Sequence, residues 1–228
     1  MIDAAALATR GEPHGTVVVA ERQTAGIGRH GHTWHSDAGG GLYLSIILRL
    51  QLLPADMPAL TMALGLAVQA AVNDYADVSA DLRWPNDVML NERKLSGIMI
   101  QAGAEGALIA GIGVNVNQKT FPDELLAIAT SLAIETGRQF VKDEILNRVV
   151  AESLRYGSLL AAAGRDEIFR RFERGSSWVR DREVTVDMDH RVIRGRTAGL
   201  DANGFLLVAT EEGLETVIAG GVRPAPHL

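Results

Sequence analysis

The sequence predicts an α+β fold, in which helices cover a mixed or antiparallel sheet and a small all-β unit follows. Between about residues 16 and 116, short apolar runs typical of buried strands are interrupted by one long helical pattern. After Gly175 the pattern changes to closely spaced short strands, separated by turns such as Ala202-Asn203-Gly204. Such strands are typical of a small barrel. We therefore expect a catalytic-type domain at residues 1–174 and a small β domain at residues 175–228.

The expected elements follow from hydrophobic spacing. In the first domain, strands are expected at residues 16–21, 42–50, 82–84, 94–101 and 107–116. Helices are expected at residues 1–10, 54–75, 141–163 and 166–174. In the second domain, strands are expected at residues 179–188, 191–200, 204–209 and 215–218. Residues 24–41 are polar and rich in glycine, which predicts a long loop of the kind that usually carries function or is disordered.

Composition narrows the class of protein. The net charge of −6 disfavours DNA or RNA as the main partner, because nucleic-acid binders usually present a basic face. The chain has no cysteine, so disulfides, zinc-thiolate sites and cysteine nucleophiles are excluded. Residues 60–72 form the most apolar run, but polar residues interrupt it and no membrane span is expected. No secretory signal pattern is visible, so a cytoplasmic location is the expectation.

The glycine-rich segment is the first stretch with chemical content. Gly26 to Gly31 matches a GxGxxG pattern, but it leads into more loop and not into a helix, so a dinucleotide fold is rejected. Glycine leaves backbone N–H groups unshielded, which suits a loop that wraps an anion. His30, His32 and His35 are weak metal candidates, because the loop offers them no cysteine.

Two further stretches carry polar groups at strand ends. Arg83-Trp84-Pro85-Asn86-Asp87 is a turn that places a carboxamide and a carboxylate at the edge of a sheet. Lys94 opens an otherwise apolar strand, so its charge must meet an anion or reach water. Residues 111–117 (GIGVNVN) interrupt a buried strand with glycine and asparagine, a sign of close ligand approach. These residues also have purely structural interpretations. Trp34 and Trp84 could pack in the core, and Asn115 could satisfy backbone hydrogen bonds of a bulged strand.

Taken in order, these stretches resemble the motifs of biotin protein ligases. ERQTAGIGR with a later tryptophan resembles the biotin loop, RWPNDV with KLSGIMI resembles the KWPND–KLxGIL block, and GIGVNVN resembles the GIGxN segment. Residues 129–132 (ATSL) resemble a further landmark. The resemblance implies a class II synthetase-like catalytic domain and an SH3-like C-terminal barrel. It also implies an ATP-dependent enzyme that forms biotinyl-5′-AMP with Mg²⁺ and passes biotin to a lysine of a biotin carboxyl carrier protein.

The same resemblance implies roles for individual residues. The catalytic residues would be Lys94, Arg29 and Asp87. Contacts to biotin would come from Gln23, Gly26, Ile27, Gly28, Arg29, Gly41, Leu42, Leu44, Lys94, Gly97 and Ile98. Contacts to ATP would come from Arg29, Trp34, Arg83, Asn86, Lys94 and Asn115. Lys94 would bridge the biotin carboxylate and the α-phosphate, and Asp87 would bind Mg²⁺ or orient the acceptor lysine.

Some positions depart from the family pattern. Arg83 stands where lysine is usual, which keeps the charge and changes its shape. The family has a strand and a Ser-Thr-Asn motif before its first helix, and Met1 aligns with about that asparagine. We therefore expect a shortened chain with weak biotin affinity and an open strand edge that permits a homodimer. No DNA-binding domain precedes the motifs, so a repressor type is not expected.

Two other functions are compatible with the sequence. A lipoate or octanoate ligase of the same superfamily would attach a different acyl chain, but Gln23 and the Trp-Pro-Asn-Asp block favour biotin. A non-catalytic biotin-binding protein is the alternative from another class, and the absent Ser-Thr-Asn motif favours it. Release of pyrophosphate from ATP that depends on biotin separates these functions.

Overall fold

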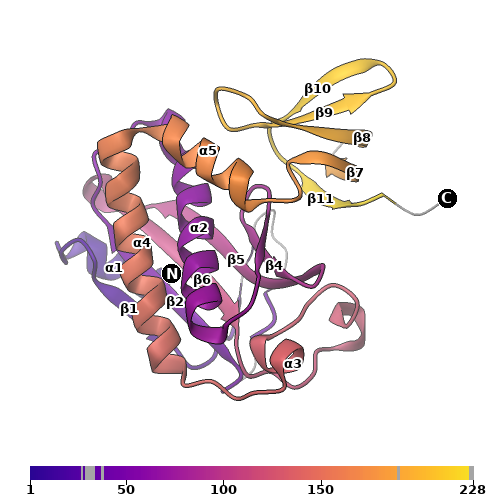
Figure 1. Ribbon diagram of the computed structural model, residues 1–228. Coiled ribbons are helices and arrows are strands. Elements are labelled where there is room, and N and C mark those ends of the chain that lie inside the picture. The colour runs from indigo at the N-terminus through magenta and orange to yellow at the C-terminus, as the bar shows by residue number, and fades with distance from the viewer. Residues whose placement is uncertain (27, 29–33, 37–38, 189–190, 226–228) are drawn as a thin grey trace.

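The chain forms two antiparallel sheets joined by a helical segment (Figure 1). The computed structural model describes residues 1–26, 28, 34–36, 39–188 and 191–225. The first sheet has the strand order β1-β2-β6-β5-β4-β3, and the second has the order β10-β9-β8-β7-β11. Every strand pair within the two sheets is antiparallel.

The first sheet and its helices occupy the N-terminal part of the chain. Its strands are β1 (Val17–Ala20), β2 (Gly41–Leu48), β3 (Asp81–Arg83), β4 (Asp87–Leu90), β5 (Arg93–Ala102) and β6 (Leu108–Asn115). The α-helices are α1 (Ile2–Thr9), α2 (Met57–Ala76), α3 (Leu132–Thr136), α4 (Lys142–Ala163) and α5 (Arg165–Gly175). Short 3₁₀ turns are η2 (Pro54–Asp56), η3 (Ala104–Gly106) and η4 (Asp123–Leu125). The second sheet contains β7 (Arg180–Met188), β8 (Arg191–Leu200), β9 (Leu206–Thr210), β10 (Gly213–Val217) and β11 (Gly221–Pro224).

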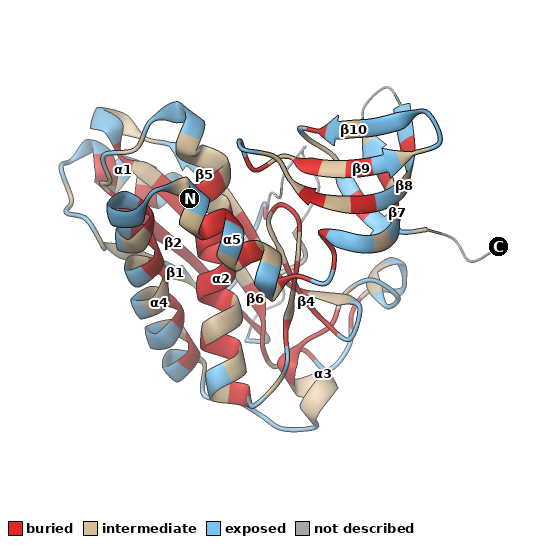
Figure 2. Cartoon of the chain, turned by 45° about the horizontal axis from the view of Figure 1, so that its top comes forward, coloured by how far each residue is buried: buried red, intermediate tan, exposed pale blue. Residues whose placement is uncertain are grey.

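Helices α2 and α4 lie side by side on one face of the first sheet, with α2 buried along most of its length (Figures 1 and 2). The outer side of α4 is exposed, as expected for a helix with one apolar face. Helix α1 packs on the opposite face of the sheet, where Ala4 and Ala8 meet Ile47 and Ile109. Beside α1, this face, called the open face below, carries glycines at positions 97, 111 and 113.

Helix α2 is a long apolar helix of the first domain. Within the described residues, the segment Pro54–Ala76 is 23 residues long and passes the length and composition test for a bilayer span. Polar residues such as Gln69 interrupt its apolar run. Most of this helix is buried between the first sheet, α4 and α5, which is the position of a core helix. Gln69 is satisfied there, because its amide donates to the carbonyls of Ala80 and Gly175 at 2.8 and 2.9 Å.

The segment between α5 and β7 ties the second sheet to the first. The Ser176 hydroxyl donates to the carbonyl of Leu82 at 2.6 Å. The backbone N–H of Ser177 donates to the Asp81 carboxylate at 2.9 Å. Trp178 follows and is buried, with 1% of its surface exposed. The strand β3 therefore lies directly beside the start of the second sheet.

The predicted fold class is confirmed, including a small C-terminal sheet consistent with an SH3-like domain. Three short elements were missed: β4, α3 and β11. Each is at most five residues long, too short to show a period in the sequence. β11 also ends in a proline, which is tolerated because β11 is an edge strand. The division at residues 174 and 175 stays a prediction.

Candidate functional site

The candidate site lies on the open face of the first sheet, where three glycines form its floor. Gly97 on β5 is paired with Gly113 on β6, and Gly111 stands opposite Met99. Side chains alternate along a strand, so these positions share one face. A methyl group at Gly113 would lie 2.7 Å from the indole of Trp34, and one at Gly97 would lie 3.1 Å from it. The Trp34 ring therefore rests directly on Gly97 and Gly113.

The same alternation turns other predicted residues away from this floor. Leu42 and Leu44 on β2 belong to the core beneath α2, together with Ile98 on β5. Leu44 and Ile98 also border the cavity above the floor. Leu42 is not among the cavity residues, so its position gives no support to the predicted role in the biotin slot. Gly41 begins β2 and pairs with Asn115, outside the cavity.

Lys94 and Asp87 meet at one end of the floor. The hairpin of β4 and β5 brings them together, and Lys94 Nζ lies 2.6 Å from Asp87 Oδ1. Arg83 donates to the other carboxylate oxygen, with Nη2 2.7 Å from Oδ2. Burial works to raise the pKa of Asp87, but the charges and hydrogen bonds of Lys94 and Arg83 together outweigh it and hold that pKa below its usual range. Asp87 is therefore a largely shielded carboxylate between two cations.

The backbone of Lys94 is held as firmly as its side chain. Its N–H donates to the carbonyl of Ile128 at 2.8 Å, and its carbonyl accepts from the N–H of Thr130 at 3.0 Å. The ATSL landmark thus lies beside Lys94 in a short parallel bridge through Ala129. The Lys94 ammonium stands 5.5 Å from the centre of the Trp34 ring, within cation–π range.

The Trp-Pro-Asn-Asp turn is braced on both sides. The Asn86 amide donates to the carbonyl of Ile98 at 3.0 Å, and the Ile98 N–H donates back to the Asn86 carbonyl at 3.0 Å. Trp84 points the other way, and its indole N–H donates to the carbonyl of Gly204 in the second domain at 2.9 Å. Asn86 lines the cavity. Trp84 lies in the core, which agrees with the structural interpretation of this residue given above.

Gln23, Gly28 and Trp34 bring the glycine-rich segment to the cavity. The Trp34 N–H donates to the Gly26 carbonyl at 2.9 Å. The hydroxyl of Ser36 donates to the Gln23 carbonyl at 3.1 Å and fixes the start of the segment. A methyl group at Gly26 would lie 2.7 Å from Gln23 Oε1, so glycine is needed for this close approach. Ile27 and Arg29, with roles predicted from the motif, lie outside the described residues, as do His30 and His32.

Asn115 and Arg83, two of the residues predicted to contact ATP, already form hydrogen bonds with other groups of the protein. Asn115 is 3% exposed, and its amide oxygen accepts from Gln118 at 3.1 Å while its nitrogen lies 3.4 Å from the Lys94 carbonyl. Arg83 contacts Asp87 and does not border the cavity. Their roles toward ATP stay predictions. What the structure shows is that both residues support Lys94, directly or through Asp87.

The metal role predicted for Asp87 has little support from its surroundings. Mg²⁺ binds carboxylate oxygens that are free to face it. Both oxygens of Asp87 already face a cation, and the described residues contain no group of three or more His, Cys, Asp or Glu that could hold an ion. The surroundings of Asp87 therefore do not fit a magnesium ion held by this carboxylate.

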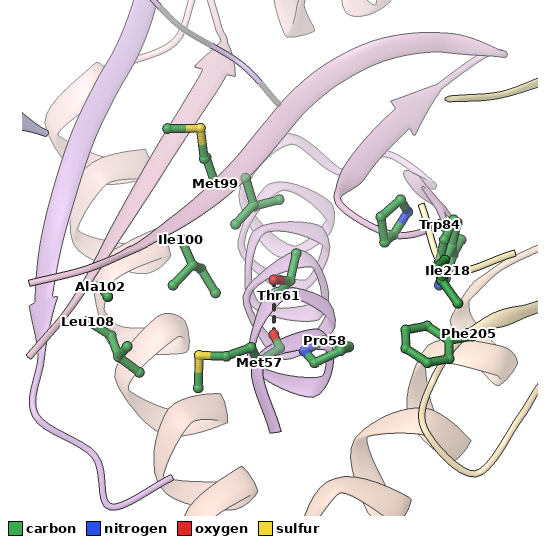
Figure 3. A pocket seen from close by; sticks show the side chains of 12 residues that line it. Met57, Pro58, Thr61, Trp84, Met99, Ile100, Ala102, Leu108, Phe205 and Ile218 are labelled. Carbon is green, nitrogen blue, oxygen red and sulfur yellow. Dashed lines mark hydrogen bonds between the residues drawn. The ribbon is translucent and has the colours of Figure 1, made fainter. Parts of the chain in front are cut away.

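A second and larger cavity lies on the other side of β5, at the junction of the two domains (Figure 3). Its volume is about 350 Å³, against about 60 Å³ for the cavity over the glycine floor. Figure 3 shows Met57 and Thr61 of α2 facing Ile100 of β5 on one side and Phe205 and Ile218 of the second domain on the other. The Thr61 hydroxyl is satisfied by the Met57 carbonyl at 3.1 Å, so this lining offers little specific chemistry.

Several residues of the site had no individual role predicted from the sequence, although residues 111–117 were expected to lie close to a ligand. The cavity is also bordered by Met1, Met99, Gly111, Ile112 and Gly113. The glycines had a usable signal, because Gly111 and Gly113 are spaced by two and must share a face. Met1 had none: its side chain packs over Gly111 through the placement of α1. Gln23, Gly28, Asn86, Lys94 and Gly97 were predicted and do meet at the cavity.

Comparison with known proteins agrees with this architecture. Residues 7–119 match the family model described as the biotin/lipoate A/B protein ligase family. The bifunctional ligase/repressor BirA of Bacillus spizizenii is 33% identical over 95% of this chain and 68% of its own length. A biotin protein ligase from Aquifex aeolicus, solved in complex with biotin and ATP, superimposes with a TM-score of 0.85 at 32% identity over 94% of this chain and 91% of that one. The chain belongs to the biotin/lipoate A/B protein ligase family.

The second domain narrows this membership to the biotin protein ligases. Residues 181–222 match the model described as the biotin protein ligase C terminal domain. The biotin–[acetyl-CoA-carboxylase] ligase of Paracoccus denitrificans is 28% identical over 90% of this chain and 88% of its own length. The resemblance stated from the motifs is thereby confirmed.

Proposed function

We propose that this enzyme joins biotin to AMP with ATP and then passes the biotinyl group to a lysine of an acceptor protein. The observation that carries the proposal is the position of Lys94. It stands beside the glycine floor, with Asp87 2.6 Å away and Gln23 and Asn86 bordering the same cavity. Relatives of this ligase family include a structure with biotin and ATP bound, and biotin and ATP are the substrates that follow for this chain.

The first step brings two anions together. An oxygen of the biotin carboxylate attacks the α-phosphorus of ATP, the bond to the β-phosphate oxygen breaks, and pyrophosphate leaves. Lys94 supplies a positive charge at the meeting point, which offsets repulsion and stabilises the charge that develops on the phosphate. The cluster of Arg83, Asp87 and Lys94 keeps a net positive charge, since two cations share one carboxylate.

The second step consumes the mixed anhydride. The amine of the acceptor lysine attacks the biotinyl carbonyl, an amide forms, and AMP leaves with the electron pair of the broken bond. Asp87 lies in the site and the sequence predicts that it orients this lysine. In the structure its carboxylate is paired with Lys94 and Arg83, so we assign it first to holding Lys94.

Binding of the substrates requires Trp34 to leave its resting place. Ligand pockets are usually ~300 Å³ or more, whereas the cavity over the floor is about 60 Å³ with the Trp34 ring on Gly97 and Gly113. The indole nitrogen of Trp34 is buried with no hydrogen-bond partner within the described residues. Displacement of this ring opens the floor and frees an aromatic face for a planar group of the ligand.

The acceptor is proposed from the named relatives. The ligases of Mycobacterium tuberculosis and Paracoccus denitrificans are named for acetyl-CoA carboxylase. We therefore infer a biotin carboxyl carrier domain as acceptor of this chain. A homodimer stays a prediction: β1 is an edge of the first sheet and could pair with a second copy. The lipoate alternative is not favoured, because the C-terminal model is specific to biotin protein ligases.

The test is release of pyrophosphate by the purified chain with ATP and one acid at a time. Biotin should give release, and lipoate and octanoate should give none above background. Addition of a carrier domain should then produce a mass gain of one biotinyl group on the carrier. Release that is independent of biotin, or that prefers lipoate, would overturn the proposal.

A further inference from the structure

Arg83 joins the catalytic cluster to the second domain. Two nitrogens of its guanidinium donate to Asp87 Oδ2, Nη2 at 2.7 Å and Nε at 3.3 Å. The same guanidinium lies 5.4 Å from the centre of the Trp178 ring. Arg83 is mostly shielded from water, with 18% of its side chain exposed. It is thus held from both sides by protein groups.

Trp178 is itself clamped in the segment that leads into the second sheet. Its ring is buried, and Arg182 on β7 lies 3.6 Å from its centre. Arg182 pairs with Glu92 in the turn between β4 and β5, so it does not reach Asp87. The two arginines therefore share one aromatic ring but differ in what else they touch. Only Arg83 connects the ring to the carboxylate that holds Lys94.

Resting on the proposed function, we propose that Arg83 is a positioning residue for adenylation, which fixes Asp87 so that its other oxygen presents Lys94 to the site. The order of contacts is Trp178, Arg83, Asp87 and Lys94, with each link within hydrogen-bond or cation–π distance. Through this series the second domain sets the geometry of the catalytic lysine, although none of its described residues borders the cavity over the glycine floor.

Two physical effects follow from the position of Arg83. The planar guanidinium fork fixes the carboxylate in one orientation, which a single ammonium does not do as well. Arg83 also offsets the charge of Asp87, so that Lys94 is oriented by a carboxylate without being neutralised by it. Without Arg83, Lys94 and Asp87 would form a neutral pair, and the carboxylate could rotate and release the lysine.

The experiment compares Arg83→Gln with Arg182→Gln in the full chain. Arg182→Gln is the matched control, because it removes a cation from the same ring without touching Asp87. For Arg83→Gln we expect kcat of biotin-dependent pyrophosphate release to fall roughly tenfold or more, with the KM for biotin little changed. Arg182→Gln should keep the kcat of the parent. Arg83→Lys restores the charge but not the planar fork, and it should recover only part of the lost kcat.

A second readout needs no substrate. The chain has lysines only at positions 94, 119 and 142. Labelling with a small acylating reagent, followed by mass spectrometry, measures each lysine against the other two. The labelling rate of Lys94 should rise from the parent to Arg83→Gln and again to Asp87→Asn, while Lys119 and Lys142 stay constant. Urea unfolding of each variant checks that the fold is kept.

The outcomes separate this inference from the proposed function. If the parent chain releases no pyrophosphate with biotin, the proposed function fails, and the labelling order alone decides whether Arg83 fixes Asp87 and Lys94. If the parent is active and Arg83→Gln matches Arg182→Gln in kcat, the positioning role is wrong. An unchanged labelling rate of Lys94 in a folded Arg83→Gln variant overturns it as well.

Discussion

The two faces of β6 carry opposite kinds of side chain, although the strand is the same. On the core face, Ala110 and Val114 are completely buried. On the open face, Gly111 and Gly113 alternate with them and leave room for the ring of Trp34. A binding hollow on a sheet is thus made by omitting side chains on one face while the other face keeps the fold together. Substitutions on the two faces should therefore have separable effects.

The largest effect is expected for Lys94→Ala on the open face. Loss of the Lys94 cation at the cavity floor should reduce biotinyl-AMP formation by more than about a hundredfold, or about 3 kcal/mol of transition-state stabilisation. The measurement is pyrophosphate release under saturating biotin and ATP. Lys142→Ala, at the exposed start of α4, is the control and should leave the rate unchanged. Near-normal adenylation by the Lys94 variant would remove this residue from the mechanism.

Neighbouring residues on β6 test the comparison directly. Gly113→Ala adds a methyl group to the floor that the substrate covers once Trp34 has moved, so substrate binding should weaken by roughly tenfold with little change in stability. Val114→Ala removes two buried methyl groups from the core face, which should cost roughly 2 kcal/mol of unfolding free energy with KM unchanged. Steady-state kinetics and urea unfolding are measured on both variants. Equal losses of both properties in both variants would break the distinction between the faces.

Acid should expose the contribution of Asp87 to stability. Its pKa in the folded chain is held below the unfolded value despite burial, because Lys94 and Arg83 favour the charged form. The carboxylate therefore stabilises the fold above its unfolded pKa, and this stabilisation is lost as pH falls through its folded pKa. Asp87→Asn should lose stability less steeply than the parent between about pH 5 and 2. Exposed Asp187→Asn is the control, and a slope equal to that control would contradict the prediction.

The smallest effect concerns the resting position of Trp34. Of the three tryptophans, Trp84 and Trp178 are fixed in the core, so a change in fluorescence on adding biotin and ATP should come from Trp34. We expect a shift of the emission in the parent and none in Trp34→Phe. An emission shift that persists in Trp34→Phe would show that the change occurs at another tryptophan, and it would contradict the displacement of the Trp34 ring.

Much of this arrangement could be predicted from the sequence, and the reason differs by residue. Lys94 and Asp87 lie close in the chain, on strands joined by a tight turn, so their meeting follows from a hairpin. Gln23 and Asn86 were placed at the site by motif resemblance. No local sequence pattern predicted that the Leu42 side chain faces the core, because its orientation depends on the register between β2 and β6. A shift of one residue would have reversed it.

The contacts of Trp178 could not be predicted at all. They join segments far apart in the chain, and only the packing of the second domain on β3 brings Trp178 to Arg83. The same holds for Trp84 and Gly204, which meet through the turn between β8 and β9. Short elements such as β4 and β11 escaped for a different reason, since four residues do not define a period.

Part of the junction between the two domains is built on main-chain acceptors. Trp84 donates to the carbonyl of Gly204, Ser176 to that of Leu82, and Gln69 to that of Gly175. A carbonyl is present whatever side chain a position carries, so the accepting half of these three bonds is insensitive to sequence change. Their donors belong to the catalytic domain or to the segment that leaves it, whereas Arg180 and Arg182 of β7 pair with the side chains of Glu173 and Glu92. Chimeras that replace residues 181–222 with the matching region of a distant relative should therefore still dock, as long as the borrowed turn keeps the left-handed backbone that Gly204 adopts beside Phe169. In respect of these three bonds the second domain can be exchanged, because the donors stay with the rest of the chain.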